Sequence, residues 1–71
     1  MKIAPGIYRH YKGPLYEVLG TATHSETGEL LVMYRALYGE FILSARPAGM
    51  FEESVAHEGQ TLPRFSLVKA F

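Results

Sequence analysis

Apolar and polar residues alternate in short runs along this chain, and glycine or proline separates many of the runs. Alternation with a period of two is typical of half-buried β-strands, and Gly and Pro mark the turns between them. The pattern predicts strands over residues 8–11, 15–24, 30–38, 41–47, 55–57 and 62–67, a polar turn at 25–29 and a single helical turn within 48–54.

Two of these strands carry a further signal. Gly20 interrupts the run at residues 15–24 and predicts a bulge or a bend, because a strand glycine packs no side chain. The run LLVMYRALY at residues 30–38 also suits a helix, since Leu, Met and Ala favour helices. The turns on both sides of it favour a strand.

Short strands with frequent turns and one helical turn predict an all-β fold. We expect a small SH3-like β-barrel of five to six short antiparallel strands. An OB-like barrel is the alternative, but that fold usually needs more residues and a longer helix between its third and fourth strands.

Length and composition predict one globular domain over residues 1–71, because 48% of the residues are hydrophobic and 20% are charged. The chain has no cysteine, which excludes disulfides and thiolate zinc sites. No apolar run approaches the ~18 residues of a membrane span. We therefore expect a cytoplasmic protein without membrane contact.

Charge constrains the class of partner. Seven basic residues balance seven acidic ones, so the net charge is zero with the histidines neutral. Proteins that bind nucleic acid through phosphate neutralisation usually have a basic excess, which this chain as a whole lacks. A local basic cluster is still compatible with this composition.

The segment YRHYKG, at residues 8–13, is dense in aromatic and charged residues. Alternation along a strand puts Tyr8, His10 and Lys12 on one face and Arg9 and Tyr11 on the other. One interpretation is a core tyrosine whose hydroxyl meets solvent or the backbone, beside a solvated charged edge. The other is an aromatic and basic ligand surface.

The segment HSETGE, at residues 24–29, offers the residue types of a hydrolase. His24 and Ser25 are adjacent, however, and adjacent residues of an extended chain point to opposite faces. Turn roles are the simpler hypothesis, with a Ser25 or Thr27 hydroxyl bonding the backbone and His24 tying the hairpin to another strand. His10, His24, His57 and Glu26 show no metal-ligand spacing, so we predict no metal site.

Four arginines each stand beside an aromatic residue or a proline: Arg9, Arg35, Arg46 and Arg64. A guanidinium group can hold a carboxylate or phosphate and can stack on a ring. If two or three of them converge near a tyrosine such as Tyr8, Tyr34 or Tyr38, they form an anion or nucleobase pocket. The alternative is a set of ion pairs that clasp the strands, with Glu17, Glu26, Glu40 and Glu52 as partners.

The chain also resembles a known family. The segments that carry the resemblance are GIYRHYKG, YEVLGTATHSETGE, YRALYG, RPAGMFEESV and PRF, in that order. They resemble the bacterial DUF1653 family, which implies a small β-rich fold and no established activity. The chain departs from the family pattern at Ser44, where members usually carry tryptophan or another bulky aromatic residue. A stacking platform at this position would be missing here.

The leading hypothesis is a non-enzymatic binding or adaptor module for a peptide, a protein or a small anionic ligand. Single-stranded RNA binding is the alternative, with tyrosines stacking on bases. A hydrolase-like enzyme using His24 and Glu26 is the third. We expect no cofactor, and a monomer or a weak homodimer. The candidate ligand-binding residues are Tyr8, Arg9, His10, Tyr11, Lys12, His24, Glu26, Arg35, Arg46 and Arg64.

Overall fold

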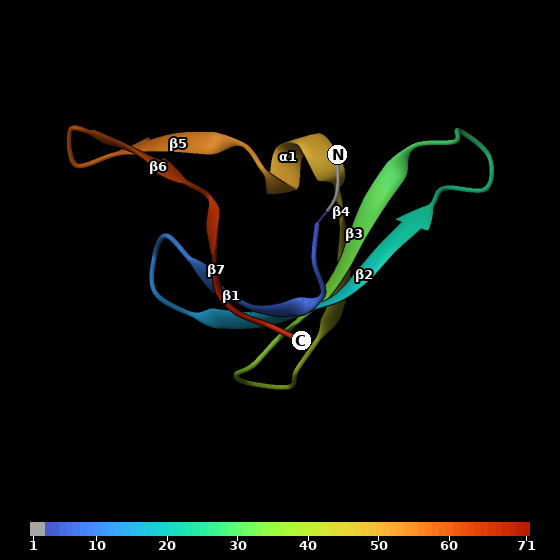
Figure 1. Cartoon of the computed structure of the whole chain (residues 1–71), viewed down its shortest axis with the longest axis horizontal. Helices are drawn as coiled ribbons and strands as arrows, with labels where there is room; N and C mark the ends of the chain where they lie inside the picture. The colour runs from blue at the N-terminus through green and yellow to red at the C-terminus, as the bar shows by residue number, and fades with distance from the viewer. Residues whose placement is uncertain (1–2) are drawn as a thin grey trace.

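Strands dominate the computed structural model, which describes residues 3–71 (Figure 1). A single helix of four residues, α1, lies between the fourth and fifth strands. The elements in chain order are β1 (Gly6–His10), β2 (Leu15–Thr23), β3 (Leu30–Ala36), β4 (Leu43–Pro47), α1 (Ala48–Phe51), β5 (Ser54–His57), β6 (Gln60–Pro63) and β7 (Phe65–Ala70). The predicted all-β class and the single helical turn are confirmed.

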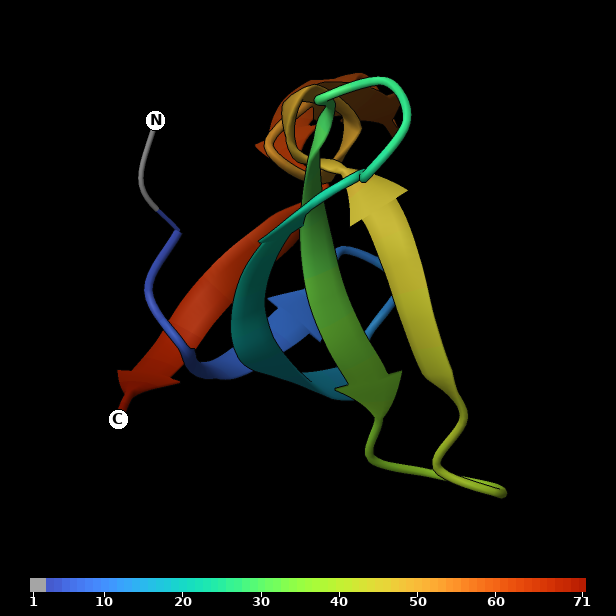
Figure 2. The same ribbon diagram turned by 90° about the vertical axis from the view of Figure 1, so that its right-hand side faces the viewer.

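The strands form two antiparallel sheets. Five of them pair in the order β4-β3-β2-β1-β7, and β5 pairs with β6 in a separate hairpin. β4 and β7 are the two edges of the larger sheet, which is bent but open (Figure 2). Within residues 3–71 no ladder joins these edges, so closure into an SH3-like barrel is not confirmed. The chain after β4 turns into α1 and then into the separate hairpin, and neither pairs with the exposed edge of β4.

The predicted irregularity at Gly20 is confirmed. The register between β2 and β3 shifts between Val18 and Gly20, and Gly20 has a φ of 149°. An L-residue rarely adopts this backbone conformation, so glycine suits the position. The bulge bends β2 and with it the sheet.

The last predicted strand is the element that differs most from expectation. Instead of one strand over residues 62–67, β6 ends at Pro63 and β7 begins at Phe65. Arg64 stands between them and bonds in two directions, because its N–H donates to the Glu53 carbonyl at 2.9 Å and its carbonyl accepts the Tyr11 N–H at 3.0 Å. These two hydrogen bonds hold the corner where the chain leaves the hairpin. The predicted strand at residues 30–38 is confirmed as β3, which ends at Ala36.

The core lies between the concave face of the sheet and α1. Phe51 of α1 is 2% exposed and stacks on Phe65 of β7, with 4.3 Å between ring centroids and 6° between ring planes. Val18 and Val32 of the central strands are fully buried beneath them. The remaining core side chains are Ile3, Tyr8, Tyr34 and Ala48. The four-residue helix is thus held by this packing together with the hydrogen bond from the Glu52 N–H to the Ala48 carbonyl at 3.1 Å.

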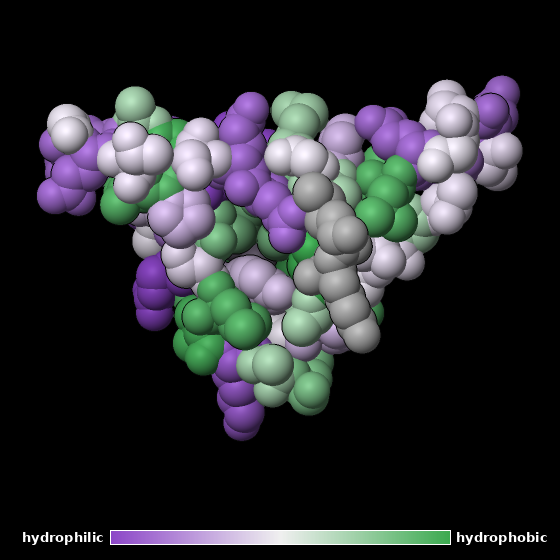
Figure 3. Space-filling model, turned by 45° about the horizontal axis from the view of Figure 1, so that its top comes forward, coloured by the Kyte–Doolittle hydropathy of each residue, from purple (hydrophilic) through white to green (hydrophobic). Residues whose placement is uncertain are grey.

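Outside this core, apolar side chains reach the surface in several places on the face shown in Figure 3. Large ones lie on β7, where Leu67 and Val68 are each 52% exposed, and in the turn between β3 and β4. Scattered apolar residues are normal for a small domain. No helix within residues 3–71 is both long enough and apolar enough to cross a membrane.

Candidate functional site

The structure divides the YRHYKG segment between the core and the surface. Tyr8 is 8% exposed, and its hydroxyl donates a hydrogen bond to the Ala4 carbonyl at 2.7 Å. This is the core tyrosine with a backbone partner that the sequence suggested. Arg9 is exposed on the opposite face of β1, and its Nη1 donates to the Gly13 carbonyl at 3.0 Å. Tyr8 and Arg9 therefore do not share a ligand surface.

The turn from β1 into β2 holds two half-buried rings, His10 and Tyr11, and the exposed Lys12. The His10 and Tyr11 rings are 4.5 Å apart, and Lys12 Nζ lies 5.8 Å from the Tyr11 ring centroid. The His57 ring packs edge-on against Tyr11 at 5.2 Å, which joins the β5–β6 hairpin to this turn. His10 Nδ1 accepts the Lys12 N–H at 3.2 Å. The turn is thereby held in one conformation.

Two distant arginines join this group, as the sequence allowed. Partial burial lowers the pKa of His10 from its usual value of 6.5, and the positive charges of Arg64, Lys12 and Arg46 lower it further. All three charges that act on His10 are cationic. We call Lys12, Arg46 and Arg64, whose charges all lower the pKa of His10, the cationic cluster. It forms although the net charge of the chain is zero.

The predicted clasp of ion pairs is confirmed in part. Arg35 Nη2 lies 2.8 Å from Glu17 Oε1, on the face of the sheet opposite the core. Arg64 pairs with Glu53 at 2.8 Å and not with Glu52. The Arg64–Glu53 backbone hydrogen bond brings those two residues together and explains the choice. These are the ion pairs found in residues 3–71.

Arg46 and Arg64 keep donors that the described protein groups do not use. Arg46 has no ion-pair partner within residues 3–71, and its Nε donates to the Tyr34 hydroxyl at 3.2 Å. Arg64 Nε is buried and has no hydrogen-bond partner there. A buried donor without an acceptor is destabilising unless another group satisfies it. Arg46 can therefore donate to an anion through its Nη groups, while Arg64, whose Nη2 pairs with Glu53, has only its Nη1 left for one.

A hollow of about 380 Å³ lies beside the cationic cluster. Three tyrosines line it, and Tyr16 packs edge-on against the other two, Tyr34 at 5.6 Å and Tyr38 at 5.7 Å. We call this space the tyrosine hollow. It is lined by Tyr16, Tyr34, Ala36, Tyr38, Gly39, Glu40, Ile42 and Ser44.

Tyr16 connects the hollow to the cationic cluster. Its ring lies 6.2 Å from the His10 ring, and its hydroxyl is 2.8 Å from the Tyr38 hydroxyl, in a hydrogen bond that either oxygen can donate. Partial burial, together with this hydrogen bond and the neighbouring phenols, raises the pKa of Tyr16 to about 12, while the positive charge of Arg46 acts in the opposite direction. Tyr16 stays neutral at physiological pH.

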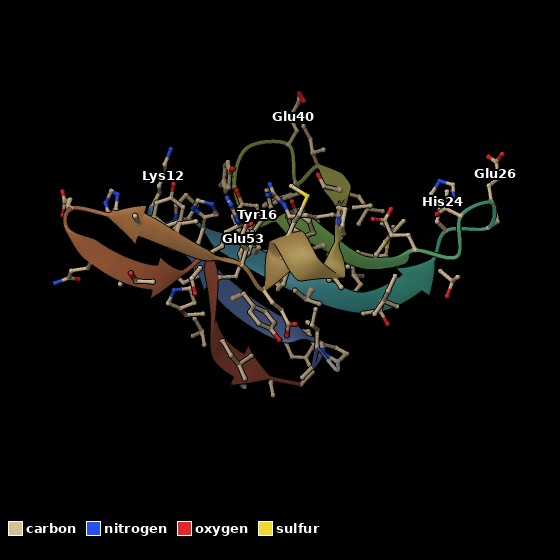
Figure 4. All side chains as sticks on the ribbon, turned by 90° about the horizontal axis from the view of Figure 1, so that it is seen from above. Lys12, Tyr16, His24, Glu26, Glu40 and Glu53 are labelled. Atoms are coloured by element: carbon tan, nitrogen blue, oxygen red, sulfur yellow. The ribbon has the colours of Figure 1, made fainter. Side chains whose placement is uncertain are left out.

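The other predicted candidates lie elsewhere. Figure 4 shows His24 and Glu26 at the tip of the β2–β3 hairpin, far along the molecule from Lys12. There His24 Nδ1 accepts the Glu26 N–H at 3.1 Å, and the Thr27 hydroxyl accepts the Glu29 N–H at 3.1 Å. His24 and the Thr27 hydroxyl thus bond the turn's own backbone. Within residues 3–71 no group of three or more His, Asp or Glu side chains is placed to hold a metal ion.

The sequence did not single out Tyr16 or Ala36, and it marked Ser44 only as a departure from the family pattern. Ala36 faces Tyr16 across the β2–β3 ladder, and Ser44 faces Tyr34 across the β3–β4 ladder. Small residues opposite tyrosines leave the space that becomes the hollow. Ser44, where the resemblance implies an aromatic residue, opens the wall at that point. Only the register reveals these pairs, because their members are far apart in the chain.

Comparison with known proteins agrees with this geometry. The sequence profile of the family described as "Protein of unknown function (DUF1653)" matches residues 6–67. A crystal structure of a protein belonging to DUF1653 from Bordetella bronchiseptica is 38% identical in sequence and superposes with a TM-score of 0.89, covering 97% of this chain and 91% of that one. No curated protein matches the chain. With a profile match over most of its length and a relative of the same fold at this identity, the chain belongs to the DUF1653 family.

Proposed function

We propose that this domain is a non-enzymatic binding module that holds an anionic group against Arg46 and Arg64, beside the tyrosine hollow. The group belongs to a peptide, a protein partner or a small ligand. The proposal includes a cytoplasmic location, in keeping with a chain without cysteine. It also includes a structural relationship between the bent five-stranded sheet and SH3-like barrels.

The observation that carries the proposal is Arg46, which has no ion-pair partner within residues 3–71 and whose Nε donates to the Tyr34 hydroxyl on the wall of the tyrosine hollow. A cation without a partner beside a hollow can be offset by a bound anion. Arg46 is already oriented by its bond to Tyr34, which leaves its Nη groups to meet an anion. Hydrogen bonds to a charged group stabilise by about 1.5–3 kcal/mol each. Hydrogen bonds from Arg46 to an anion would therefore contribute to its binding.

Sulfate is a suitable probe because it is fully ionised across the range in which histidine titrates. We would titrate His10 by NMR in sodium sulfate and in sodium chloride at equal ionic strength. An anion bound at the cationic cluster should raise the pKa of His10, because it offsets the charges of Arg64, Lys12 and Arg46. Arg46→Gln should abolish most of this difference between the two salts.

Arg35→Gln is the matched control for this experiment. Like Arg46→Gln, it removes one arginine charge, but from the opposite face of the five-stranded sheet, where Arg35 pairs with Glu17. The sulfate effect on His10 should persist in this variant. The ring resonances of His24, at the far hairpin, report effects of salt on the whole chain. A His10 pKa that is identical in the two salts would contradict the proposal.

Nucleic-acid binding is the second candidate, favoured by the exposed Lys12 beside the half-buried rings of Tyr11 and His57. Lys12 lies over the Tyr11 ring, so a cation and an aromatic ring stand together at this turn. Short single-stranded RNA should then shift the Tyr11 and His57 resonances, and the effect should fade steeply with salt. A ligand held chiefly through the tyrosine hollow would show a weak dependence on salt.

A further inference from the structure

We infer that the free edge of β4 binds an extended peptide as an added antiparallel strand, and that this peptide carries an acidic residue two positions before a large apolar one. The inference rests on the proposed function, since the acidic side chain is the anion that Arg46 holds. It adds the class of partner, an acidic and apolar peptide segment, and the way in which the segment docks.

The backbone of β4 is available for pairing. β4 is an edge of the five-stranded sheet, with β3 on one side and, within residues 3–71, no strand on the other (Figure 2). The Ala36 N–H donates to the Ile42 carbonyl at 3.2 Å, so Ile42 bonds toward β3. Bonding direction alternates along an antiparallel strand, so the backbone groups of Leu43 and Ala45 point outward. They offer an added strand a ladder of hydrogen bonds.

The side chains of β4 specify which residues the added strand should carry. Ser44 and Arg46 lie on the concave face, where Ser44 lines the tyrosine hollow and Arg46 belongs to the cationic cluster. Peptide residues opposite these two positions form non-hydrogen-bonded pairs, in which Cα atoms are only about 4.5 Å apart. An antiparallel peptide meets Arg46 first and Ser44 second. The fitting order is therefore an acidic residue, any residue, and a large apolar residue.

The surroundings of the edge support a peptide as the occupant. Ile42 and Leu43 are 63% and 58% exposed, and Phe41 before them adopts a φ of 54°, which is unusual for a bulky residue. Apolar groups presented in this way favour contact with another chain. A second copy of β4 fits poorly, because its sequence LSARP has no acidic residue to place opposite Arg46.

The probe is an acetylated and amidated heptapeptide of threonines with glutamate at its third and leucine at its fifth position. We would titrate the full chain with it and follow the amide resonances of Leu43 and Ala45 and the rings of Tyr16 and Tyr38. All four should shift together, and the Ala45 amide should become protected from hydrogen exchange. The same peptide with glutamate and leucine exchanged should bind at least about fivefold more weakly.

N-methylation separates strand addition from side-chain capture. A methyl group on the amide of the central threonine removes the donor that would face the Ala45 carbonyl, and binding should fall about tenfold. A methyl group on the leucine amide, which would face away from β4, is the matched control and should change affinity far less. Equal loss from the two methylated peptides, or no binding of the parent peptide, would overturn the inference.

Ala45→Pro gives a second and independent test, since proline is tolerated on edge strands but lacks the outward N–H. The variant should lose the peptide and keep the effect of sulfate on the pKa of His10. Retention of full peptide affinity would overturn strand addition. A wild-type chain that responds to sulfate but not to the peptide would overturn this inference alone. A chain that responds to neither would overturn the proposed function with it.

Discussion

Tyr16 is the residue on which the two parts of the site meet. Its ring lies near the ring of His10, on which the cationic cluster acts. It also packs edge-on against Tyr34 and Tyr38, which line the tyrosine hollow. Aromatic pairs in edge-on geometry add about 0.5–1.5 kcal/mol beyond their buried area. A ring with several such neighbours is held firmly, so the hollow is preformed before any ligand arrives.

Replacing the partner of the Tyr16 hydroxyl tests this arrangement. Tyr38→Phe should lower the pKa of Tyr16 from about 12 but leave it above 10.0, because partial burial is the larger cause and persists. A pH titration that follows the Tyr16 ring carbons by NMR would measure the change. Tyr11→Phe removes a hydroxyl outside the hollow and should leave the pKa of Tyr16 as it is. An unchanged value in Tyr38→Phe would mean that the two hydroxyls do not interact.

His10 links the cationic cluster to stability. Its pKa is lowered in the folded chain, so the unfolded chain binds the proton more readily. The contribution of neutral His10 to stability is full above 6.5 and is lost as pH falls through the lower, folded pKa. The free energy of unfolding of the wild type, measured by urea denaturation, should therefore decrease as the pH is lowered from 7.5 to 5.5. His10→Gln should flatten this dependence, and an equally steep slope in that variant would assign the effect to other groups.

At the scale of elements, the sheet depends on close contact between β1 and β7. Gly6 faces Ala70 across this ladder, and a Cβ atom at Gly6 would collide with the Lys69 carbonyl oxygen and lie 3.0 Å from the Ala70 Cα. These are backbone atoms of a paired strand, which cannot move aside as a flexible side chain can. Glycine at this position therefore sets how tightly the last strand joins the sheet.

Gly6→Ala should push β7 away from β1 and destabilise the domain by about 1–3 kcal/mol, the usual cost of overpacking. Gly49→Ala is the matched control, because a Cβ atom there meets nothing within 4 Å. Its position in α1 should make it neutral or stabilising by up to about 1 kcal/mol. Urea denaturation of both variants would measure the difference. Equal stabilities would show that the β1–β7 contact is looser than described.

For the whole molecule, the stacked pair of Phe51 and Phe65 holds together elements that do not pair as strands. Phe51 also packs edge-on against Tyr8 and Tyr34, which lie on β1 and β3. At about 0.05–0.15 kcal/mol per residue, a chain of 71 residues has a total stability of about 4–11 kcal/mol. One aromatic side chain therefore accounts for a large share of it.

Phe51→Ala should cost about 3–5 kcal/mol and leave much of the chain unfolded at 25 °C. Met50→Ala changes the neighbouring residue of α1, which is 48% exposed, and should cost far less. Circular dichroism during thermal unfolding would compare the two variants. A Phe51→Ala protein as stable as Met50→Ala would show that α1 is not part of the folding core.

The sequence by itself determined the local features of this protein. Period-two alternation, the Gly20 interruption and the turn at residues 25–29 predicted most strands of the structure, while the choice of Tyr8 as the core tyrosine of its strand came only from the structure. The family resemblance was readable as well, because its segments are contiguous. Each of these patterns is contained in a short stretch of adjacent residues, because backbone conformation responds mainly to near neighbours in the chain.

Only the tertiary structure decided what those strands build. It left the sheet open, broke the last predicted strand at Arg64, and placed the Arg46 guanidinium against the Tyr34 hydroxyl. It also set Ala36 and Ser44 opposite tyrosines and so made the hollow. Each of these results depends on pairing between distant segments. Pairing is fixed by packing of the whole core, and no run of adjacent residues encodes it.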